Sequence, residues 1–259
     1  MRLLQALFLA LSVASAGPVP ATVSLSDTRL VFDGRFTDVS VEARNRGSQE
    51  VLLQAWLEAR EGSEARSTDL PFVLTPPISR LAPDGRQALR LMYEGRGMPT
   101  DHESLLHLYV MEIPRLIPGD SQLSIAIRQR INVLFRPPGL VGDPALTPAR
   151  LRWVVDADAE GGPRLRVENP TAFHAALLRL ELADEQGSRP LGDDLLVLPG
   201  EQREVVLVSG LASGGYWLRF NALTDYGGQR TYTARFDFDS PFSASLVGDA
   251  SSSAERTSP

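Results

Sequence analysis

Few side chains in this sequence could support enzyme chemistry, and their spacing does not assemble a catalytic site. The three histidines are His102, His107 and His174. His102 and His107 lie five residues apart where a loop enters a predicted strand, so they would face opposite sides of a sheet, whereas a metal-binding pair on one strand needs an even spacing. We expect both to be surface or rim histidines. The sequence contains no phosphate-binding glycine motif and no serine nucleophile motif.

Paired carboxylates, which can work together in acid–base catalysis, occur at residues 193–194 and within 156–160. Both groups lie in polar, turn-like sequence, where solvated loop charge is the simpler interpretation. The sequence has no cysteine, which excludes thiol nucleophiles and thiolate metal sites. We therefore expect no enzyme activity, no metal and no cofactor.

The charge balance and the first residues indicate what kind of environment the protein works in. A net charge of −6 argues against nucleic acid as a partner, and all 26 basic residues are arginine, so every cationic task falls to arginine. Arg2, the apolar run 3–13 and the small residues 14–16 are typical of a secretory signal peptide that is cleaved after Ala16. Because the run is too short to cross a bilayer, we expect an exported protein without membrane insertion.

The most regular pattern lies in residues 122–137, which read QLSIAIRQRINVLFRP. Its period of two predicts a long β-strand. Gln129 is the single polar member of a row of apolar side chains on one parity: Leu123, Ile125, Ile127, Ile131, Val133 and Phe135. The pattern alone leaves two interpretations open, namely a core strand of a β-sandwich or a strand whose apolar row is offered to another chain.

Turn signals between short alternating segments predict an all-β fold with two sandwich domains of immunoglobulin type. About seven strands are expected in the first domain, which we place at 17–137. Residues 136–150 contain four prolines and two glycines, so we predict a stiff hinge at 138–149. A second, smaller sandwich is predicted at 150–240, and the small polar residues 241–259 predict a disordered tail.

Several motifs in these strands resemble those of the periplasmic chaperones of the chaperone–usher pilus pathway, of which PapD is the familiar member. They span about residues 23 to 238 and read VSLSDTRLVFDG, TPPISRL, DHESLLHLYVMEIP, RINVLFRP, VENPTAFHAALL and LTDYGGQR. The resemblance implies two immunoglobulin-like domains set at an angle around a cleft, a periplasmic location and no catalytic activity. It also implies two partners, which are pilus subunits that the chaperone binds, folds and caps, and the outer-membrane usher that receives them.

In this family the subunit lacks the last strand of its own fold, and the chaperone inserts a strand of its first domain into the gap. On the matching positions, the resemblance assigns Leu123, Ile125 and Ile127 to filling the groove of the subunit. The short loop RLIPGDS before this strand, together with the absence of cysteine, resembles the short-loop branch, whose subunits form rod-like pili. Whether the free chaperone covers this strand by self-association is left open.

The family also binds the terminal carboxylate of the subunit in the cleft, with an arginine and a lysine. Arg29 matches the arginine, whereas the neutral Asn132 occupies the lysine position. Arg130 lies two residues earlier on the same parity and can supply the missing charge. The resemblance further implies an ion network that fixes the angle between the domains, and the matching residues are Glu103, Arg136 and Asp225.

An alternative from another class of protein is an exported two-domain adhesin or carbohydrate-binding module. Such a module would present aromatic side chains on a loop or in a groove. The three tryptophans, Trp56, Trp153 and Trp217, lie instead within strand-like sequence and are predicted to be core residues. Their placement favours the chaperone.

Overall fold

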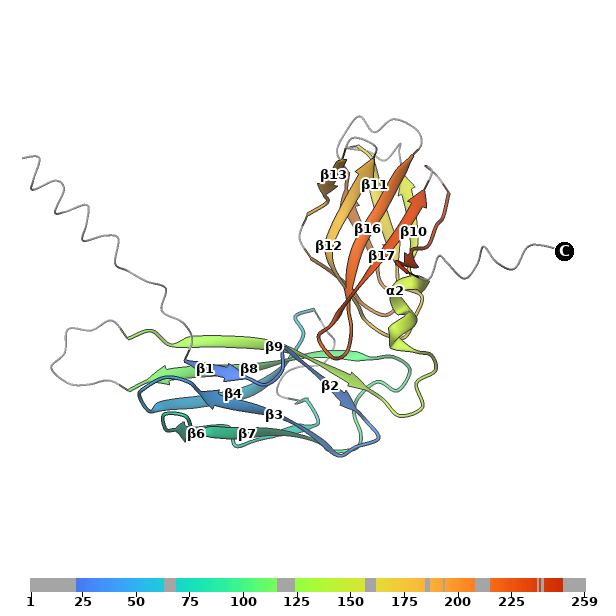
Figure 1. The fold of residues 1–259 in the computed structure, drawn as a ribbon. Coiled ribbons are helices and arrows are strands. Elements are labelled where there is room, and N and C mark those ends of the chain that lie inside the picture. Colours follow the sequence, from blue (N-terminus) through green and yellow to red (C-terminus); the bar gives the residue numbers. More distant parts are fainter. Residues whose placement is uncertain are drawn as a thin grey trace, which may run out of the picture.

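The chain forms two β-sandwich domains that are set at an angle to each other (Figure 1). The computed structural model describes residues 22–62, 69–115, 124–156, 162–184, 187–192, 194–207, 215–236, 238 and 240–248. Leu123, most of the loop before it, the predicted signal peptide and the end of the predicted tail, from residue 249, lie outside the described residues. No described helix is long and apolar enough to span a membrane.

The N-terminal domain contains two sheets. One has the order β1 (Val23–Leu25), β3 (Asp38–Asn45), β7 (Arg86–Tyr93) and β5 (Phe72–Thr75). The other has the order β2 (Arg29–Asp33), β9 (Ile127–Arg136), β8 (Ser104–Pro114), β4 (Val51–Ala59) and β6 (Ile78–Leu81). Strands β2 and β9 pair in parallel, whereas the other pairs in both sheets are antiparallel.

Alternation along these strands turns one row of apolar side chains from each sheet toward the space between the sheets. The resulting core includes the fully buried side chains Phe32, Val41, Leu53, Leu89, Leu108 and Val133. Aromatic rings close one end of this core, where Phe135 lies 5.6 Å from Phe32 and 4.7 Å from Tyr93 between ring centroids. The strand with the most regular alternation, β9, is thus a central strand of its sheet at this end.

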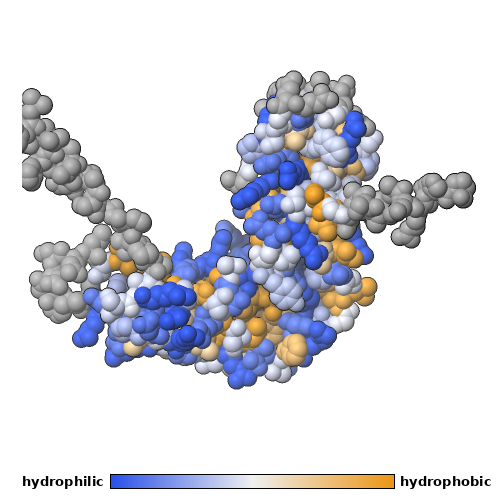
Figure 2. All heavy atoms as spheres, viewed as in Figure 1, coloured by the Kyte–Doolittle hydropathy of each residue, from blue (hydrophilic) through white to orange (hydrophobic). Residues whose placement is uncertain are grey.

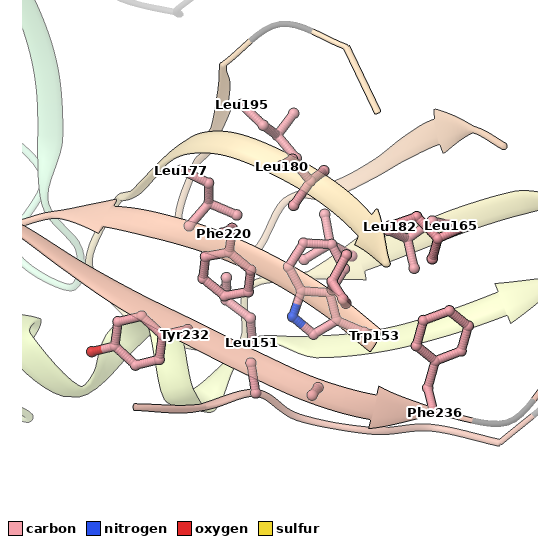
Figure 3. Packing of buried hydrophobic residues seen from close by; sticks show 14 of the residues in the cluster. Leu151, Trp153, Leu165, Leu177, Leu180, Leu182, Leu195, Phe220, Tyr232 and Phe236 are labelled. Atoms are coloured by element: carbon pink, nitrogen blue, oxygen red, sulfur yellow. The ribbon is translucent and has the colours of Figure 1, made fainter. Parts of the chain in front are cut away.

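The C-terminal domain has its own core, separate from that of the first domain (Figure 3). Its smaller sheet has the order β10 (Arg152–Asp156), β11 (Arg164–Glu168) and β15 (Gln202–Val206). Its larger sheet has the order β13 (Gly187–Pro190), β12 (Ala175–Asp184), β16 (Tyr216–Leu223), β17 (Gln229–Phe236) and β18 (Ser245–Leu246), and β14 (Leu195–Val197) also pairs with β12. Trp153 lies in the centre of this core, 5.6 Å from Phe220 between ring centroids.

Two connections bring the domains together. After β9, the chain forms the short 3₁₀ helix η2 (Pro144–Leu146) and the one-turn helix α2 (Thr147–Arg150) before β10. The β16–β17 hairpin then returns toward the N-terminal domain, and its turn positions Gly227, at φ +77°, beside Thr28. The cleft between the domains is therefore bordered by β2 and β9 on one side and by this hairpin on the other.

The predicted all-β fold with two immunoglobulin-like sandwiches is confirmed, with corrections in detail. The predicted disordered tail is wrong in its first part, because Phe242 bridges to Trp153, Ala244 is buried in the core and β18 pairs with β17. The described part of the first domain contains nine strands rather than about seven, partly because the first predicted strand is divided between two sheets as β1 and β2. Trp153 is a core residue as predicted, but the prediction for Trp217 is wrong, because this side chain is 44% exposed on the outer face of β16. Trp56 is half-buried and stacks on Tyr109, 5.3 Å between ring centroids.

Candidate binding edge and interdomain cleft

The two edges of β9 are covered to different extents. On one side β8 pairs with it from residue 127 to residue 135. On the other side β2 pairs only with residues 132–136. Among the described strands, none pairs with this second edge over residues 127–131. Alternate backbone N–H and C=O groups along that edge are therefore available to a strand from another chain.

The apolar row of β9 changes from buried to exposed along the same strand. Ile131, Val133 and Phe135 are buried in the core, Ile127 is half-buried, and Ile125 is 48% exposed just before the strand begins. Since these residues share one parity, the row that fills the core continues into solvent at the open edge. Figure 2 shows the open angle between the domains, with apolar atoms exposed on the N-terminal domain below it.

Gln129, the polar interruption of this row, anchors the beginning of β1. Its Nε2 donates a hydrogen bond of 2.8 Å to the carbonyl oxygen of Val23. The buried carboxylate of Glu112 accepts hydrogen bonds from the backbone N–H groups of Thr22 and Val23, at 3.1 and 2.9 Å, and another from the Thr22 hydroxyl. The sequence analysis missed this pair of anchors, because nothing in the alternation indicates which strand Gln129 and Glu112 would meet.

The structure brings Glu103, Arg136 and Asp225 together between the domains. Arg136 donates to Glu103 Oε2 from Nη2 at 2.6 Å and from Nε at 3.0 Å. It donates to Asp225 Oδ2 from Nη1 at 2.9 Å, across the domain boundary. Arg136 therefore joins a carboxylate of its own domain to a carboxylate of the other domain.

His174 belongs to the same network, although the sequence analysis did not assign it. Its Nδ1 lies 2.7 Å from Glu103 Oε1, and its backbone N–H donates to the same oxygen at 3.0 Å. Both side chains are almost fully buried, at 4% and 1% exposure. Burial favours the neutral acid and would raise the pKa of Glu103, but the hydrogen bonds from His174 and the charge of Arg136 outweigh it and lower that pKa.

Arg29 lies beside this network with few partners of its own. Its Nη1 makes one long contact, 3.5 Å, with the carbonyl oxygen of Thr224. Within the described residues it forms no ion pair, since its guanidinium has no carboxylate oxygen within 4 Å. Burial lowers the pKa of Arg29, and the charges of Asp225 and Glu103 offset only part of that effect. A half-buried guanidinium in this state can bind an incoming carboxylate.

Asn132 and Arg130 lie further along the outer face of β9. Asn132 is the neighbour of Arg29 in the parallel pair and lies opposite His107 on β8. Arg130 is exposed and lies opposite Tyr109, two residues further along β9 toward the open edge. His107 is half-buried on this face, consistent with the predicted rim position, and His102 is also half-buried, with its side chain 43% exposed next to Asp101.

Comparison with known proteins assigns the family. Residues 22–141 match the N-terminal domain of the pili and flagellar-assembly chaperone PapD, and residues 147–234 match the C-terminal domain of the pili assembly chaperone PapD. The two matches together cover most of the chain and span both sandwiches. The protein therefore belongs to the PapD-like family of pilus-assembly chaperones.

Relatives match over nearly their whole length. The probable fimbrial chaperone YadV of Escherichia coli K12 is 32% identical over 224 residues, which cover 83% of this chain and 90% of YadV. The chaperone protein FimB/FhaD of Bordetella pertussis is 31% identical over 241 residues, covering 86% of this chain and 91% of that protein. The crystal structure of YadV superimposes with a TM-score of 0.71 at 28% identity, covering 83% of this chain and 100% of that chain.

A structure of the Salmonella enterica chaperone SafB in complex with the SafA pilin also matches, with a TM-score of 0.68 at 25% identity. It covers 85% of this chain and 99% of that chain. Family membership decides between the chaperone and the adhesin in favour of the chaperone. The protein is a periplasmic pilus-assembly chaperone of the chaperone–usher pathway, and its activity is not enzymatic.

Proposed function

We propose that this chaperone holds a pilus subunit by adding the strand around residues 123–127 to the incomplete sheet of the subunit. The observation that carries the proposal is the open edge of β9 together with the exposure of Ile125 at its end. Backbone groups of the subunit would pair with that edge, while the side chains of Leu123, Ile125 and Ile127 fill the groove of the subunit. The complex of the relative SafB with the SafA pilin supports a subunit as the partner.

Burial of this apolar row supplies much of the binding free energy in the proposal. An isoleucine side chain contributes roughly 1.5–3 kcal/mol when it is fully transferred from water into an apolar groove. Ile125 gains more than the half-buried Ile127, because about half of its surface is accessible in the free protein. The same exposed edge explains why the free chaperone could self-associate, a state that light scattering of the purified protein would reveal.

In the cleft, Arg29 binds the terminal carboxylate of the subunit. Its half-buried guanidinium lacks an ion pair among the described residues, and a charge-assisted bidentate bond to a carboxylate would satisfy it. Asn132 lies next to Arg29 and can donate a hydrogen bond but no charge. A second charge could come from Arg130 on β9 or from the opposite domain.

The Glu103–Arg136–Asp225 network, extended by His174, sets the angle between the domains and so the width of the cleft. Its support is the pair of short contacts that Arg136 makes with carboxylates of both domains. Such a network contributes more to orientation than to net stability, because desolvation offsets much of the ionic attraction. We also propose that the protein belongs to the short-loop branch and delivers its subunit to an outer-membrane usher, which the shortness of the RLIPGDS loop supports.

Co-expression in the periplasm with subunits from the same organism tests strand addition. We expect Ile125→Asp and Ile127→Asp to leave the chaperone folded but to abolish recovery of a one-to-one complex, because a buried carboxylate without a partner opposes insertion. Val73→Asp is the matched control, since Val73 is also 48% exposed but lies on β5, far along the chain from the donor strand. Recovery of normal complex with both isoleucine variants would contradict strand addition, and unfolding of either would show that its side chain faces the protein's own core.

A further inference from the structure

Three arginines line the pocket between the domains, and each comes from a different strand. Arg29 lies on β2, Arg136 on β9 and Arg230 on β17. The pocket has a volume of about 240 Å³, enough for several water molecules or for the terminal residue of a peptide. It is open to solvent between the domains and is the place where Arg29 would meet a carboxylate.

Only two of these arginines are available to a ligand. Arg136 is engaged by Glu103 and Asp225, at 2.6 and 2.9 Å. Arg29 makes the single long contact with the Thr224 carbonyl oxygen. Within the described residues, Arg230 has neither a side-chain hydrogen bond nor an ion pair.

The position of Arg230 on β17 directs it toward the cleft. It shares the parity of Tyr232, Ala234 and Phe236, which are buried between the sheets of the C-terminal domain. Arg230 occupies the same row at the end of the strand, opposite Ala222, where the sandwich opens toward the N-terminal domain. By contrast Arg235, on the same strand, has the opposite parity and is exposed on the outer face.

We propose that Arg230 supplies the second positive charge for the terminal carboxylate of the subunit, so that Arg29 and Arg230 hold it from the two domains. The inference rests on the proposed function and names a residue outside the positions where the family places its two cations. A guanidinium on each side of the pocket can pair with the two oxygens of one carboxylate.

The two residues of β9 fit this role less well. Asn132 carries no charge, and its side chain interacts with His107. Arg130 does not line the pocket that Arg29 and Arg230 share, and it lies opposite Tyr109 toward the open edge. Neither residue faces Arg29 across the cleft.

The charges around the pocket also require another cation. Its lining includes three carboxylates, Glu103, Asp143 and Asp225. Without Arg230 these carboxylates would outnumber the arginines even before the ligand entered, and a further carboxylate would be repelled. Arg230 brings the formal charges into balance and leaves Arg29 free to bind. Because the two arginines belong to different domains, recognition of the carboxylate depends on the angle that Arg136 and its partners maintain.

The test compares a free acid with an amide. The subunit that co-purifies with the wild-type chaperone supplies the sequence of a peptide with its C-terminal segment, made once with a free carboxylate and once as the C-terminal amide. Binding of each peptide to the full mature chaperone is measured by fluorescence anisotropy, for the wild type and for Arg29→Ala, Arg130→Gln, Arg230→Gln, Arg230→Lys and Arg235→Gln. Thermal unfolding of each variant checks that it is folded.

We expect the wild type to prefer the acid by about tenfold or more, as charge-assisted hydrogen bonds would give. Arg29→Ala and Arg230→Gln should lose most of this preference, Arg230→Lys should retain part of it, and Arg130→Gln and the control Arg235→Gln should keep it. If Arg130→Gln loses the preference while Arg230→Gln keeps it, the assignment of Arg230 is wrong but carboxylate anchoring stands. If the wild type binds acid and amide equally, the proposal that the cleft binds the terminal carboxylate is wrong, and the proposed role of Arg230 is wrong as well.

Discussion

The two halves of β9 carry the same alternating sequence pattern but lie in different surroundings. At residues 132–136 the strand has β8 on one side and β2 on the other, its inner side chains are buried, and Arg136 joins the ion network between the domains. At residues 127–131 only β8 pairs with it, and just before the strand begins Ile125 is exposed. One strand therefore belongs to the protein's own fold at one end and is open to a partner at the other.

This difference shows what alternation can and cannot say. A period of two indicates that every second side chain faces an apolar environment. It does not indicate whether that environment is the protein's own core or a partner chain. The deciding feature is whether another strand pairs with the second edge of β9. Strand β2 does so over residues 132–136, and no described strand does so over residues 127–131. An apolar row along an unpaired edge promotes aggregation unless another chain covers it. A bound pilus subunit would cover this row, and binding such subunits is the function of this family.

The largest difference between the two halves should appear when the same charge is introduced into each. We expect Val133→Asp to destabilise the protein by about 4 kcal/mol or more, because its side chain is fully buried and the carboxylate would have no partner. Ile125→Asp should change the free energy of unfolding by less than about 0.5 kcal/mol, as a surface substitution does. Denaturant unfolding of both variants measures the contrast, and equal losses would show that the two halves are not distinct.

The covered half should also lose stability when its ion network is cut. Arg136→Ala leaves Glu103 buried without its cation, and we expect a loss of about 3 kcal/mol. With Asp225→Ala in a double-mutant cycle, the losses should be non-additive by about 0.5 kcal/mol or more, since both side chains act through the same contact. Additive losses would mean that the charges act independently. Arg35→Ala is the control, because its pair with Asp33 is exposed and should not contribute measurably.

How much of this arrangement could be predicted depended on whether a feature is local in sequence. Alternation and turn chemistry predicted the two sandwiches, and the motifs around Arg29, Glu103 and Asp225 indicated residues that the fold brings together. His174 was missed because its partner Glu103 lies 71 residues away in the other domain. Trp217 was assigned to the core because an aromatic side chain in a strand carries no sign of which face it occupies.

A smaller effect is expected where the open half of β9 touches the first strand. Glu112→Gln can keep an amide oxygen on the backbone N–H groups of Thr22 and Val23, but it loses the negative charge that strengthens these hydrogen bonds, and we expect a loss of about 1–3 kcal/mol. Gln129→Leu removes one hydrogen bond to Val23 and completes the apolar row, so it should cost only about 1 kcal/mol. Hydrogen exchange of the β1 amides would locate both losses. An unchanged exchange rate in Glu112→Gln would show that Glu112 does not hold β1.

The smallest effect concerns His107, which lies on the outer face of the sheet at the junction between the two halves. Burial lowers its pKa, the charge of Arg130 lowers it further, and the neighbouring Asn132 side chain offsets part of the shift. A histidine that binds its proton less tightly in the folded state than in the unfolded state destabilises the fold as the pH falls below the ordinary value of about 6.5. Above that pH the ring is neutral in both states, and its contribution no longer changes.

We therefore expect the stability of the wild type to decrease as the pH is lowered from 7 through 6.5, until the pH reaches the lowered pKa of the folded state. His107→Gln should flatten this part of the profile, and Arg130→Gln should make it shallower, because it removes the positive charge that lowers the pKa of His107 most. Titration of the histidine ring protons by NMR measures the pKa directly. A value at or above 6.5 for His107 would mean that neither burial nor Arg130 lowers its pKa. The same pKa in the wild type and in Arg130→Gln would mean that Arg130 points away from the ring, toward the open edge, where its charge would be available to a partner.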